Sequence, residues 1–301
     1  MTALALLIPG GTGQLGHDLV TQAPDGSVVH HPGSRDLDVT QAGEVVRAVD
    51  GLLAVAGDRR PVVVNAAAYT AVDAAETDRE AAYSVNADGP RLLAAVCASR
   101  QVPLIQVSTD YVFAGDKTGA YEVDDPVGPQ SVYGITKLAG ESSVLRSGAE
   151  AWVVRTSWVY GASGSANFVK SILRLAGERD SLSVVDDQRG APTWSADLAA
   201  GLLELAGQIV SGNGPQARVL HCTGGGETTW YGFARAIFEE LGTDPDRVKP
   251  CTTAEFPRPA KRPANSVLSS AAWVDAGLTP LRDWREALSE SFAGFVTATR
   301  D

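Results

Sequence analysis

Tyr133 and Lys137 are the residues of this chain whose types and spacing are best suited to chemistry. They stand four residues apart in the segment YGITK, which reads as helix, so both side chains leave the same face. A free tyrosine has a pKa of about 10, and a nearby fixed positive charge stabilises the phenolate and lowers that value. The pair is therefore a candidate general acid with an adjustable pKa. For this motif alone, an ordinary surface pair is the alternative interpretation.

A glycine-rich loop near the N-terminus predicts a dinucleotide site. The apolar run from Ala3 to Ile8 has the length of a strand, and GGTGQLG at residues 10–16 follows at once. Its glycines allow a tight turn, close approach of the backbone to a pyrophosphate, and close packing of helix on strand. Free N–H groups at the start of the next helix would hold the phosphates. There is no basic region before the apolar run, so we expect no signal peptide.

The composition of the 301 residues indicates a cytoplasmic enzyme with one large or two smaller domains. The three cysteines, at positions 97, 222 and 251, form no CxxC pattern and predict reduced thiols rather than disulfides or a zinc site. A formal charge of −11 argues against binding to nucleic acid or to anionic membranes. No apolar stretch reaches the length of a membrane span.

Short apolar runs alternate with helical patterns through the first half of the chain. The expected strands are 3–8, 27–31, 61–64, 103–107 and 151–154, and the expected helices are 42–56, 79–100 and 131–145. This alternation predicts an α/β fold with a doubly wound, parallel, Rossmann-like sheet. Beyond about Tyr160, glycine and proline are more frequent and helices are expected at 196–209, 230–241 and 283–295. We therefore expect a dinucleotide-binding domain at 1–160 and a smaller mixed C-terminal substrate lobe at 161–301, with interleaved segments.

Two polar strings follow expected strands at the sheet edge where open α/β folds bind ligands. NAAAYT, residues 65–70, has small side chains that would let a flat cofactor approach the backbone. STDYVF, residues 108–113, offers two hydroxyls and a carboxylate together. A helix cap or an Asx turn is the alternative for the second string, because Ser, Thr and Asp favour both.

Together these strings resemble the extended short-chain dehydrogenase/reductase superfamily and, within it, the dTDP-4-dehydrorhamnose reductases. The glycine loop and the Tyr-Lys pair are shared across the superfamily. Four strings are more specific to the subgroup: TAVDAAE (70–76), RTSWVYG (155–161), DQRGAPT (187–193) and RPANS (262–266). The resemblance covers nearly the whole chain and also rests on LDVT (37–40), NAAAYTAVDAAE (65–76), STDYVFAG (108–115), YGITKLAGE (133–141), DDQRGAPT (186–193) and RPANSVL (262–268). The resemblance implies NADPH-dependent reduction of the C4 ketone of dTDP-4-dehydro-L-rhamnose to dTDP-L-rhamnose, the last step of dTDP-rhamnose synthesis.

The resemblance also implies roles for individual residues. Tyr133 would protonate the C4 carbonyl oxygen as hydride arrives, and Lys137 would bind the nicotinamide ribose and lower the tyrosine pKa. Thr109 would hydrogen-bond the substrate oxygen. Asp110 would contact the sugar and adjust the proton balance of the site. Val72 and Trp158 would also contact the sugar, Trp158 with an apolar face; core packing is the alternative for Trp158.

For the dinucleotide, the resemblance assigns a set of backbone and side-chain contacts: Gly10, Thr12, Gly13, Gln14, Leu15, Gly16, Arg35, Asp38, Val39, Ala66, Ala67, Ala68, Tyr69, Val107, Tyr133 and Lys137. A carboxylate about twenty residues beyond the glycine loop favours NAD, and a nearby arginine favours NADP. Asp36 and the Ser34-Arg35 pair supply both features, and we expect NADPH, with NADH also accepted. Arg189 and Arg262 are candidates for the substrate diphosphate, with surface ion pairs as the alternative.

Metal and assembly are the points where the resemblance is weakest. Some relatives use magnesium with glutamates at a dimer interface, whereas this chain has Asp18 at the first position and Ala196, beside Asp197, at the second. We therefore assign no metal ligand, leave Mg²⁺ unsupported, and expect a monomer or homodimer. Two rival functions are a 4-ketoreductase of another nucleotide-linked deoxysugar and a non-catalytic dinucleotide-binding regulatory subunit. The intact Thr109, Tyr133 and Lys137 count against the second.

Overall fold

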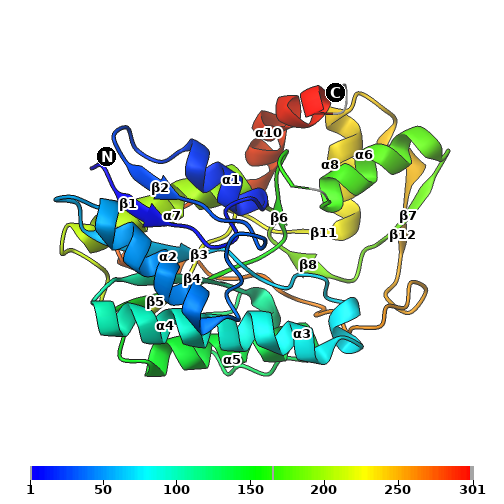
Figure 1. The fold of residues 1–301 in the computed structure, drawn as a ribbon. Coiled ribbons are helices and arrows are strands. Elements are labelled where there is room, and N and C mark those ends of the chain that lie inside the picture. Colours follow the sequence, from blue (N-terminus) through cyan, green and yellow to red (C-terminus); the bar gives the residue numbers. More distant parts are fainter. Residues whose placement is uncertain (1, 165, 299–301) are drawn as a thin grey trace.

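A computed structural model describes residues 2–164 and 166–298 of the chain (Figure 1). Its central sheet has six parallel strands in the order β2-β1-β3-β4-β5-β10. The strands are Ala5–Leu7 (β1), Val28–His30 (β2), Pro61–Asn65 (β3), Leu104–Thr109 (β4), Ala151–Thr156 (β5) and Val219–His221 (β10). The predicted doubly wound parallel sheet is confirmed. The chain reverses direction across the sheet between β1 and β3, which is where such folds bind ligands.

β4 and β5 continue two residues beyond their predicted ends. Ser108 pairs with Arg155 and Thr109 pairs with Thr156. The polar string that begins at Ser108 therefore starts on the strand itself. Backbone pairing holds Thr109 in place, which a free loop would not do.

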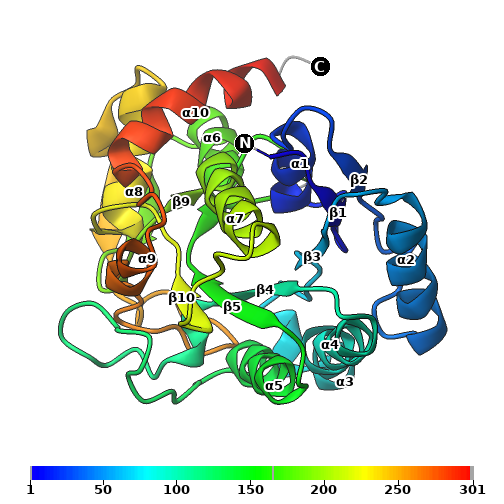
Figure 2. The same cartoon turned by 90° about the vertical axis from the view of Figure 1, so that its left-hand side faces the viewer.

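Helices cover both faces of the sheet, with α7 on one face and α4 and α5 on the other (Figure 2). The helices of this layer are Gln14–Thr21 (α1), Ala42–Val55 (α2), Arg79–Tyr83 (α3), Gly89–Arg100 (α4), Val132–Arg146 (α5), Ser195–Val210 (α7) and Ala271–Asp275 (α9). The continuous helix predicted for 79–100 is wrong in its middle, where a π-helical turn (η2) covers Ser84–Asp88. Short 3-10 helices cover Ala74–Glu76 (η1) and Asp110–Val112 (η3).

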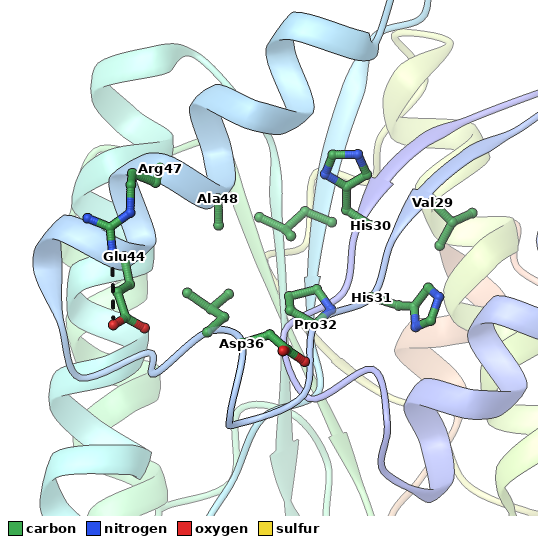
Figure 3. Close-up of a pocket in the computed structure, with 10 residues that line it drawn as sticks. Val29, His30, His31, Pro32, Asp36, Glu44, Arg47 and Ala48 are labelled. Atoms are coloured by element: carbon green, nitrogen blue, oxygen red, sulfur yellow. Dashed lines mark ion pairs between the residues drawn. The ribbon is translucent and has the colours of Figure 1, made fainter.

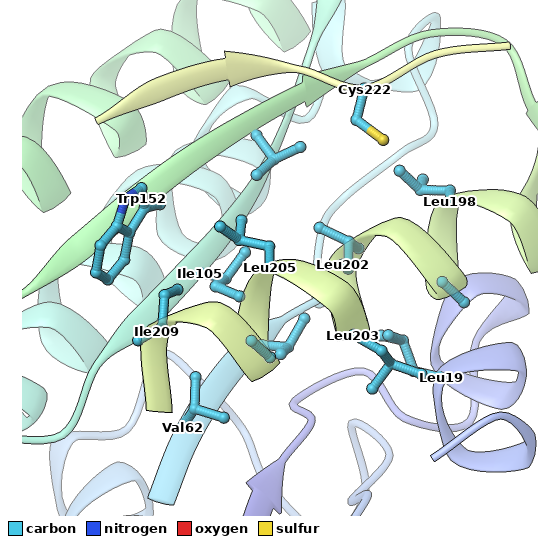
Figure 4. Close-up of a cluster of buried hydrophobic side chains, with 14 of the residues drawn as sticks. Leu19, Val62, Ile105, Trp152, Leu198, Leu202, Leu203, Leu205, Ile209 and Cys222 are labelled. Carbon is cyan, nitrogen blue, oxygen red and sulfur yellow. The ribbon is translucent and has the colours of Figure 1, made fainter. Parts of the chain in front are cut away.

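α7 and β10 come from the C-terminal half of the sequence but belong to the sheet layer. Leu198, Leu202 and Ile209 of α7 pack with Val62, Ile105 and Trp152 of the strands (Figure 4). The apolar residues on this face of α7 explain why it lies on the sheet, since burying them there removes their area from water. Beyond residue 161 the chain thus returns to the layer formed by the sheet and its helices. The domain boundary expected at residue 160 stays a prediction.

The remaining C-terminal elements form a second lobe beside the sheet (Figure 1). It contains Phe168–Glu178 (α6), Trp230–Glu240 (α8), Trp284–Ala298 (α10), Pro245–Arg247 (η4) and the short strands Val159–Tyr160 (β6), Leu182–Val185 (β7), Arg189–Gly190 (β8), Thr193–Trp194 (β9), Thr228–Thr229 (β11) and Val248–Cys251 (β12). Its own apolar core includes Val169, Phe233 and Phe295. Within 2–164 and 166–298, no helix combines the length and apolar character needed to cross a membrane.

The packing of α7 gives a first prediction. Leu202→Ala removes a side chain that is 0% exposed between α7 and the sheet, and we expect it to lower the free energy of unfolding by about 2–5 kcal/mol. Leu53→Ala on α2, where Leu53 is 37% exposed, is the matched control and should cost much less. Urea denaturation followed by circular dichroism measures both. Equal losses would show that α7 is not packed as described.

Candidate active site

Helix α5 carries Tyr133 and Lys137, and its first turn is fixed from two sides. The Ser131 hydroxyl accepts a hydrogen bond from the Gly134 N–H at 3.2 Å, and the Glu76 carboxylate accepts one from the Val132 N–H at 2.9 Å. These bonds satisfy N–H groups that have no partner inside the helix. A Cβ at Gly134 would overlap the carbonyl oxygen of Tyr111, so only glycine allows this close approach. The position of the phenol is thereby set by the backbone around it.

Tyr133 has a raised pKa in this structure. Burial raises the pKa of its phenol to about 12, and a hydrogen bond with Thr109 opposes the shift in part. The lowering expected from Lys137 is absent because burial outweighs it, and the ammonium donates a hydrogen bond to the Val107 carbonyl at 2.8 Å. The ring of Tyr111 meets that of Tyr133 edge-on, with centroids 5.4 Å apart. A phenol with this pKa keeps its proton at neutral pH, which is the state a proton donor requires.

Lys137 is 5% exposed, and burial lowers the pKa of its ammonium to about 8. The negative charge of Glu141, one turn further along α5, opposes this shift. Glu141 is itself held by Arg155 of β5, with Oε2 and Nη2 2.8 Å apart and both side chains buried. The positive charge of Arg155 thus balances the buried negative charge of Glu141, which in turn stabilises the charged form of Lys137.

Thr109 and Asp110 form a hydrogen-bonded pair at the end of β4. The Thr109 hydroxyl donates to Asp110 Oδ1 at 2.8 Å and accepts from the Tyr111 N–H at 3.2 Å. The second bond makes Thr109 the N-cap of η3, so the capping role considered for this string is real and coexists with the contact to Tyr133. Burial raises the pKa of Asp110 to about 6, and hydrogen bonds from Thr109 and Ser266 oppose the shift.

A cavity of about 590 Å³ lies in the second lobe, next to this group. Tyr111, which touches Tyr133, is one of its lining residues. The others that matter chemically are aromatic or cationic: Phe168, Trp230, Phe256, Arg179, Arg258 and Arg262. Of these, only Arg262 was predicted from the sequence, because single aromatic and basic residues scattered over positions 168–262 form no motif. Arg189, the other diphosphate candidate, is exposed instead and pairs with Glu227.

Trp158 has an unusual backbone and a stacked side chain. Its φ of 48° lies in the left-handed region, which is rare for a bulky residue. The indole stacks on Trp230 with centroids 3.5 Å apart, and a Cβ at Gly190 would overlap it. One of its faces is therefore already covered by Trp230, which leaves only the remaining surface for the predicted sugar contact. Val72 is half-buried next to Asp73; its sugar contact, like that of Trp158, stays a prediction.

The glycine loop fits a pyrophosphate. Gly10 has a φ of 78°, and a Cβ there would lie 2.7 Å from the Ala67 backbone nitrogen, so the turn requires glycine. Gly13 is the N-cap of α1 and has no side chain to cap it, which leaves the first N–H groups of the helix available to an anion. Thr12 and Gly13 are exposed, and Leu15 is half-buried. Gln14 directs its side-chain oxygen to Asn167 Nδ2 at 2.7 Å, a contact with the second lobe.

A second cavity, of about 500 Å³, lies beside β2 and α2, where the adenosine end of a dinucleotide is expected (Figure 3). Asp36 and Arg47 line it, whereas Arg35 is exposed. The carboxylate of Asp38 accepts two hydrogen bonds from Thr40, at 2.9 and 2.7 Å. Val39 is a buried core residue. Adenine contacts by Asp38 and Val39 stay predictions, and both residues have structural roles that the sequence did not reveal.

The string after β3 is held in place by two asparagines, Asn65 at the end of β3 and Asn86 of η2. Asn65 Oδ1 accepts from the Ala67 N–H at 3.1 Å, and Asn86 Oδ1 accepts from the Tyr69 N–H at 2.8 Å. Asn86 also donates to Thr136 of α5 at 3.1 Å. The segment Ala66–Ala68 is thus fixed between the glycine loop and α5.

The carboxylates at the two candidate magnesium positions are engaged with other groups. Asp18 accepts a hydrogen bond from Ser195, and Asp197 forms an ion pair with Arg282 at 2.9 Å. Ala196 has no ligating side chain. Among the residues the structure describes, no group of three His, Cys, Asp or Glu is placed to hold a metal ion. The residues present do not fit magnesium at this position.

A protonated phenol beside an ammonium, at the ligand edge of a Rossmann-like sheet, suits protonation of a carbonyl oxygen while a nicotinamide delivers hydride. The fold and the site define an oxidoreductase of the short-chain dehydrogenase/reductase class. The family model described as the RmlD substrate binding domain matches residues 4–296. With the relatives described next, this match shows that the chain belongs to the dTDP-4-dehydrorhamnose reductase family, and the resemblance seen in the sequence is confirmed.

Two relatives and one solved structure illustrate the likeness. A dTDP-4-dehydrorhamnose reductase of Mycolicibacterium smegmatis is 46% identical over 99% of this chain and 88% of its own length. A probable dTDP-4,6-dihydroxy-2-methyloxan-3-one 4-ketoreductase of Streptomyces antibioticus is 45% identical over 97% of this chain and 96% of its own. The dTDP-4-dehydrorhamnose reductase of Bacillus anthracis, solved in complex with NADP, is 32% identical, with a TM-score of 0.88 over 97% of this chain and 99% of its own.

The buried ammonium predicts a pH dependence. Because the pKa of Lys137 is about 8, its charge is present below that pH and is lost as the pH rises through it. We expect affinity for the reduced dinucleotide to fall across this range, as measured by fluorescence titration. Lys137→Met should bind more weakly and lose this pH dependence. A wild-type affinity that is constant from pH 7 to about 9 would contradict the assigned role.

The engagement of Asp18 and Asp197 predicts independence from divalent metal. Treatment with EDTA, followed by removal of the chelator, should leave the rate of NADPH oxidation unchanged, and added magnesium should not raise it. The elution volume in gel filtration should also be the same with and without the ion. A rate that falls with EDTA and returns with magnesium alone would show a metal site that these contacts do not reveal.

Proposed function

We propose that this chain reduces the C4 ketone of dTDP-4-dehydro-L-rhamnose to dTDP-L-rhamnose with NADPH, the last step of dTDP-rhamnose synthesis. The observation that carries the proposal is the position of Tyr133. Its phenol contacts Thr109 and meets Tyr111 edge-on at the border of an arginine-lined cavity. A keto-sugar placed at the phenol would have its diphosphate within that cavity.

The residues of the site divide the chemistry among them. The bound dinucleotide supplies the hydride. Thr109 turns its hydroxyl proton from Asp110 Oδ1 to the carbonyl oxygen, and Tyr133 donates a proton to that oxygen as negative charge develops. Lys137 binds the ribose hydroxyls with the N–H groups not used by Val107, and its charge stabilises the phenolate left behind. Asp110, with a pKa of about 6, is ionised at neutral pH and accepts a hydrogen bond from the substrate or from Thr109.

Support for NADPH comes from the solved Bacillus anthracis relative, which holds NADP. In this chain the 2′-phosphate would lie near Ser34 and Arg35, whose guanidinium is exposed and able to pair with it. NADH lacks this phosphate and would be accepted with lower affinity. A monomer or homodimer in the cytoplasm, acting on a small-molecule nucleotide sugar, completes the proposal.

A second candidate has specific support. The Streptomyces antibioticus relative, named as a 4-ketoreductase of another dTDP-linked sugar, is 45% identical, against 46% for the Mycolicibacterium smegmatis reductase. Identity alone therefore does not separate the two substrates. A ketoreductase for another nucleotide-linked deoxysugar would use the same Thr109, Tyr133 and Lys137. The non-catalytic alternative has no such support, since these three groups are assembled at one place.

An assay with a panel of nucleotide 4-keto-sugars tests the proposal. The purified protein should oxidise NADPH with dTDP-4-dehydro-L-rhamnose, and NMR should identify the product as dTDP-L-rhamnose. The un-epimerised dTDP-4-dehydro-6-deoxyglucose should react poorly. Tyr133→Phe should bind NADPH normally but lower kcat by a factor on the order of 10² to 10⁴, the usual worth of a positioned acid.

The alternatives predict different results in the same assay. Faster reduction of the un-epimerised sugar or of another keto-sugar would favour the second candidate. Binding of NADPH without reduction of any member of the panel would favour the non-catalytic alternative. Near-normal turnover by Tyr133→Phe would remove this residue from the role of acid.

A further inference from the structure

Asp73 binds three donors from one short segment of the second lobe. Its Oδ1 lies 3.0 Å from Arg262 Nη2 and accepts a hydrogen bond from the Ala260 N–H at 3.3 Å. Its Oδ2 lies 3.7 Å from Arg258 Nη1. We refer to Asp73, Arg258, Ala260 and Arg262 as the Asp73 cluster. Asp73 is 185 or more positions from the other three members along the chain, so the contact exists only in the folded protein.

The Arg262 guanidinium is held at one edge and free at the other. Nη2 pairs with Asp73, whereas Nη1 is buried and has no hydrogen-bond partner among the described residues. Such a donor is costly to bury unless a ligand satisfies it. Arg262 lies near the ring of Tyr111, with Cζ 5.9 Å from its centroid, and both line the 590 Å³ cavity. The unpaired donor therefore belongs to a residue that lines the cavity beside Tyr111, the neighbour of Tyr133.

The charge at this rim of the cavity suits a diphosphate. Arg179, Arg258 and Arg262 contribute three positive charges to the lining, and Asp73 offsets one of them. The chain as a whole carries −11, so this rim is locally opposite in sign to the protein. By charge alone Asp73 would weaken the binding of an anion. These contacts would still favour anion binding if the orientation that Asp73 imposes on Arg262 raises the affinity more than its negative charge lowers it.

Asp73 is also connected to the acid through the chain. It immediately precedes η1, and Glu76 at the other end of η1 accepts the hydrogen bond from Val132 at the start of α5. One turn of 3-10 helix thus joins the residue that holds Arg262 to the residue that caps the helix of Tyr133. This connection fixes the spacing between the arginine edge of the cavity and the phenol.

We propose that Asp73 is a positioning residue for substrate: it fixes Arg262 so that the free Nη1 edge binds the diphosphate of the nucleotide sugar. The proposal rests on the proposed function, since it takes the cavity to be the nucleotide-diphosphate site. It identifies the residue that sets the arginine's orientation. The sequence string TAVDAAE contains Asp73, but nothing in the string itself indicates this role.

Binding of dTDP, followed by calorimetry with NADP present, tests the proposal. Asp73→Asn should weaken dTDP binding about tenfold or more, although it makes the site more positive. Binding of thymidine, which has no phosphate, should be unchanged, as should binding of NADPH. In the assay KM for the keto-sugar should rise by a similar factor with kcat nearly kept. Asp50→Asn, which removes a carboxylate from the exposed pair with Arg100, is the matched control and should change none of these values.

A second variant covers the case in which Asp73→Asn does not fold. Arg262→Lys keeps the charge, but an ammonium lacks the two coplanar edges needed to pair with Asp73 and the diphosphate together. It should weaken dTDP binding comparably. Removing Asp73 in an Arg262→Ala background should have a smaller effect than in the wild type.

The outcomes separate this proposal from the proposed function. Unchanged or tighter dTDP binding by Asp73→Asn, with wild-type turnover intact, overturns the positioning role alone. Weaker binding of thymidine and dTDP by the same factor also overturns it, because the effect would then be general to the cavity. If the wild type binds neither dTDP nor other nucleoside diphosphates, the nucleotide-sugar assignment fails with it.

Discussion

The close approach of α5 to the neighbouring backbone is the constraint on which the site depends. A Cβ at Gly134 would overlap the Tyr111 carbonyl, and one at Gly140 would overlap the Asn86 carbonyl. The absence of side chains at these two positions lets one face of α5 lie directly against the backbone of η3 at Tyr111 and of η2 at Asn86. That face carries Tyr133, Lys137 and, one turn on, a buried glutamate. The phenol and the ammonium are placed by backbone contact, which leaves them little freedom to move.

This close packing buries charged side chains, and each buried charge is compensated by the next residue in a chain of contacts. The Lys137 ammonium is bonded to a carbonyl and faces the field of Glu141, which is paired with Arg155. Arg155 in turn lies over the ring of Phe113 and donates to the Val123 carbonyl. Removing one member of such a buried pair leaves its partner unpaired, which costs more than the pair contributes. The charge state of the lysine therefore depends on residues that never contact substrate.

Polar contacts and an aromatic stack connect the two lobes, and Val159 of β6 packs against the apolar core of the sheet layer. Each lobe also has an apolar core of its own. Gln14 of the glycine loop meets Asn167, which caps α6, and Asp73 meets Arg262. Trp158, at the end of β5, stacks on Trp230 of α8. These contacts start from segments that follow β1, β3 and β5. The segments at these strand ends thus belong to the expected dinucleotide site and also contact the lobe that contains the substrate cavity.

The sequence by itself determined five of the six strands of the sheet, most of the helices though not α6 or α9, and the common face of Tyr133 and Lys137. These features depend on local patterns: apolar periodicity, glycine spacing and i,i+4 geometry. Tertiary structure decided what depends on distant neighbours. The pKa of Tyr133 is raised because burial outweighs any effect of the lysine, and Arg262 lines the cavity whereas Arg189 binds Glu227 at the surface. Distant neighbours also determine that α7 and β10 return to the sheet and that Asp73 contacts Arg262. Burial and ion pairing arise from residues far apart in the chain, and no local pattern encodes them.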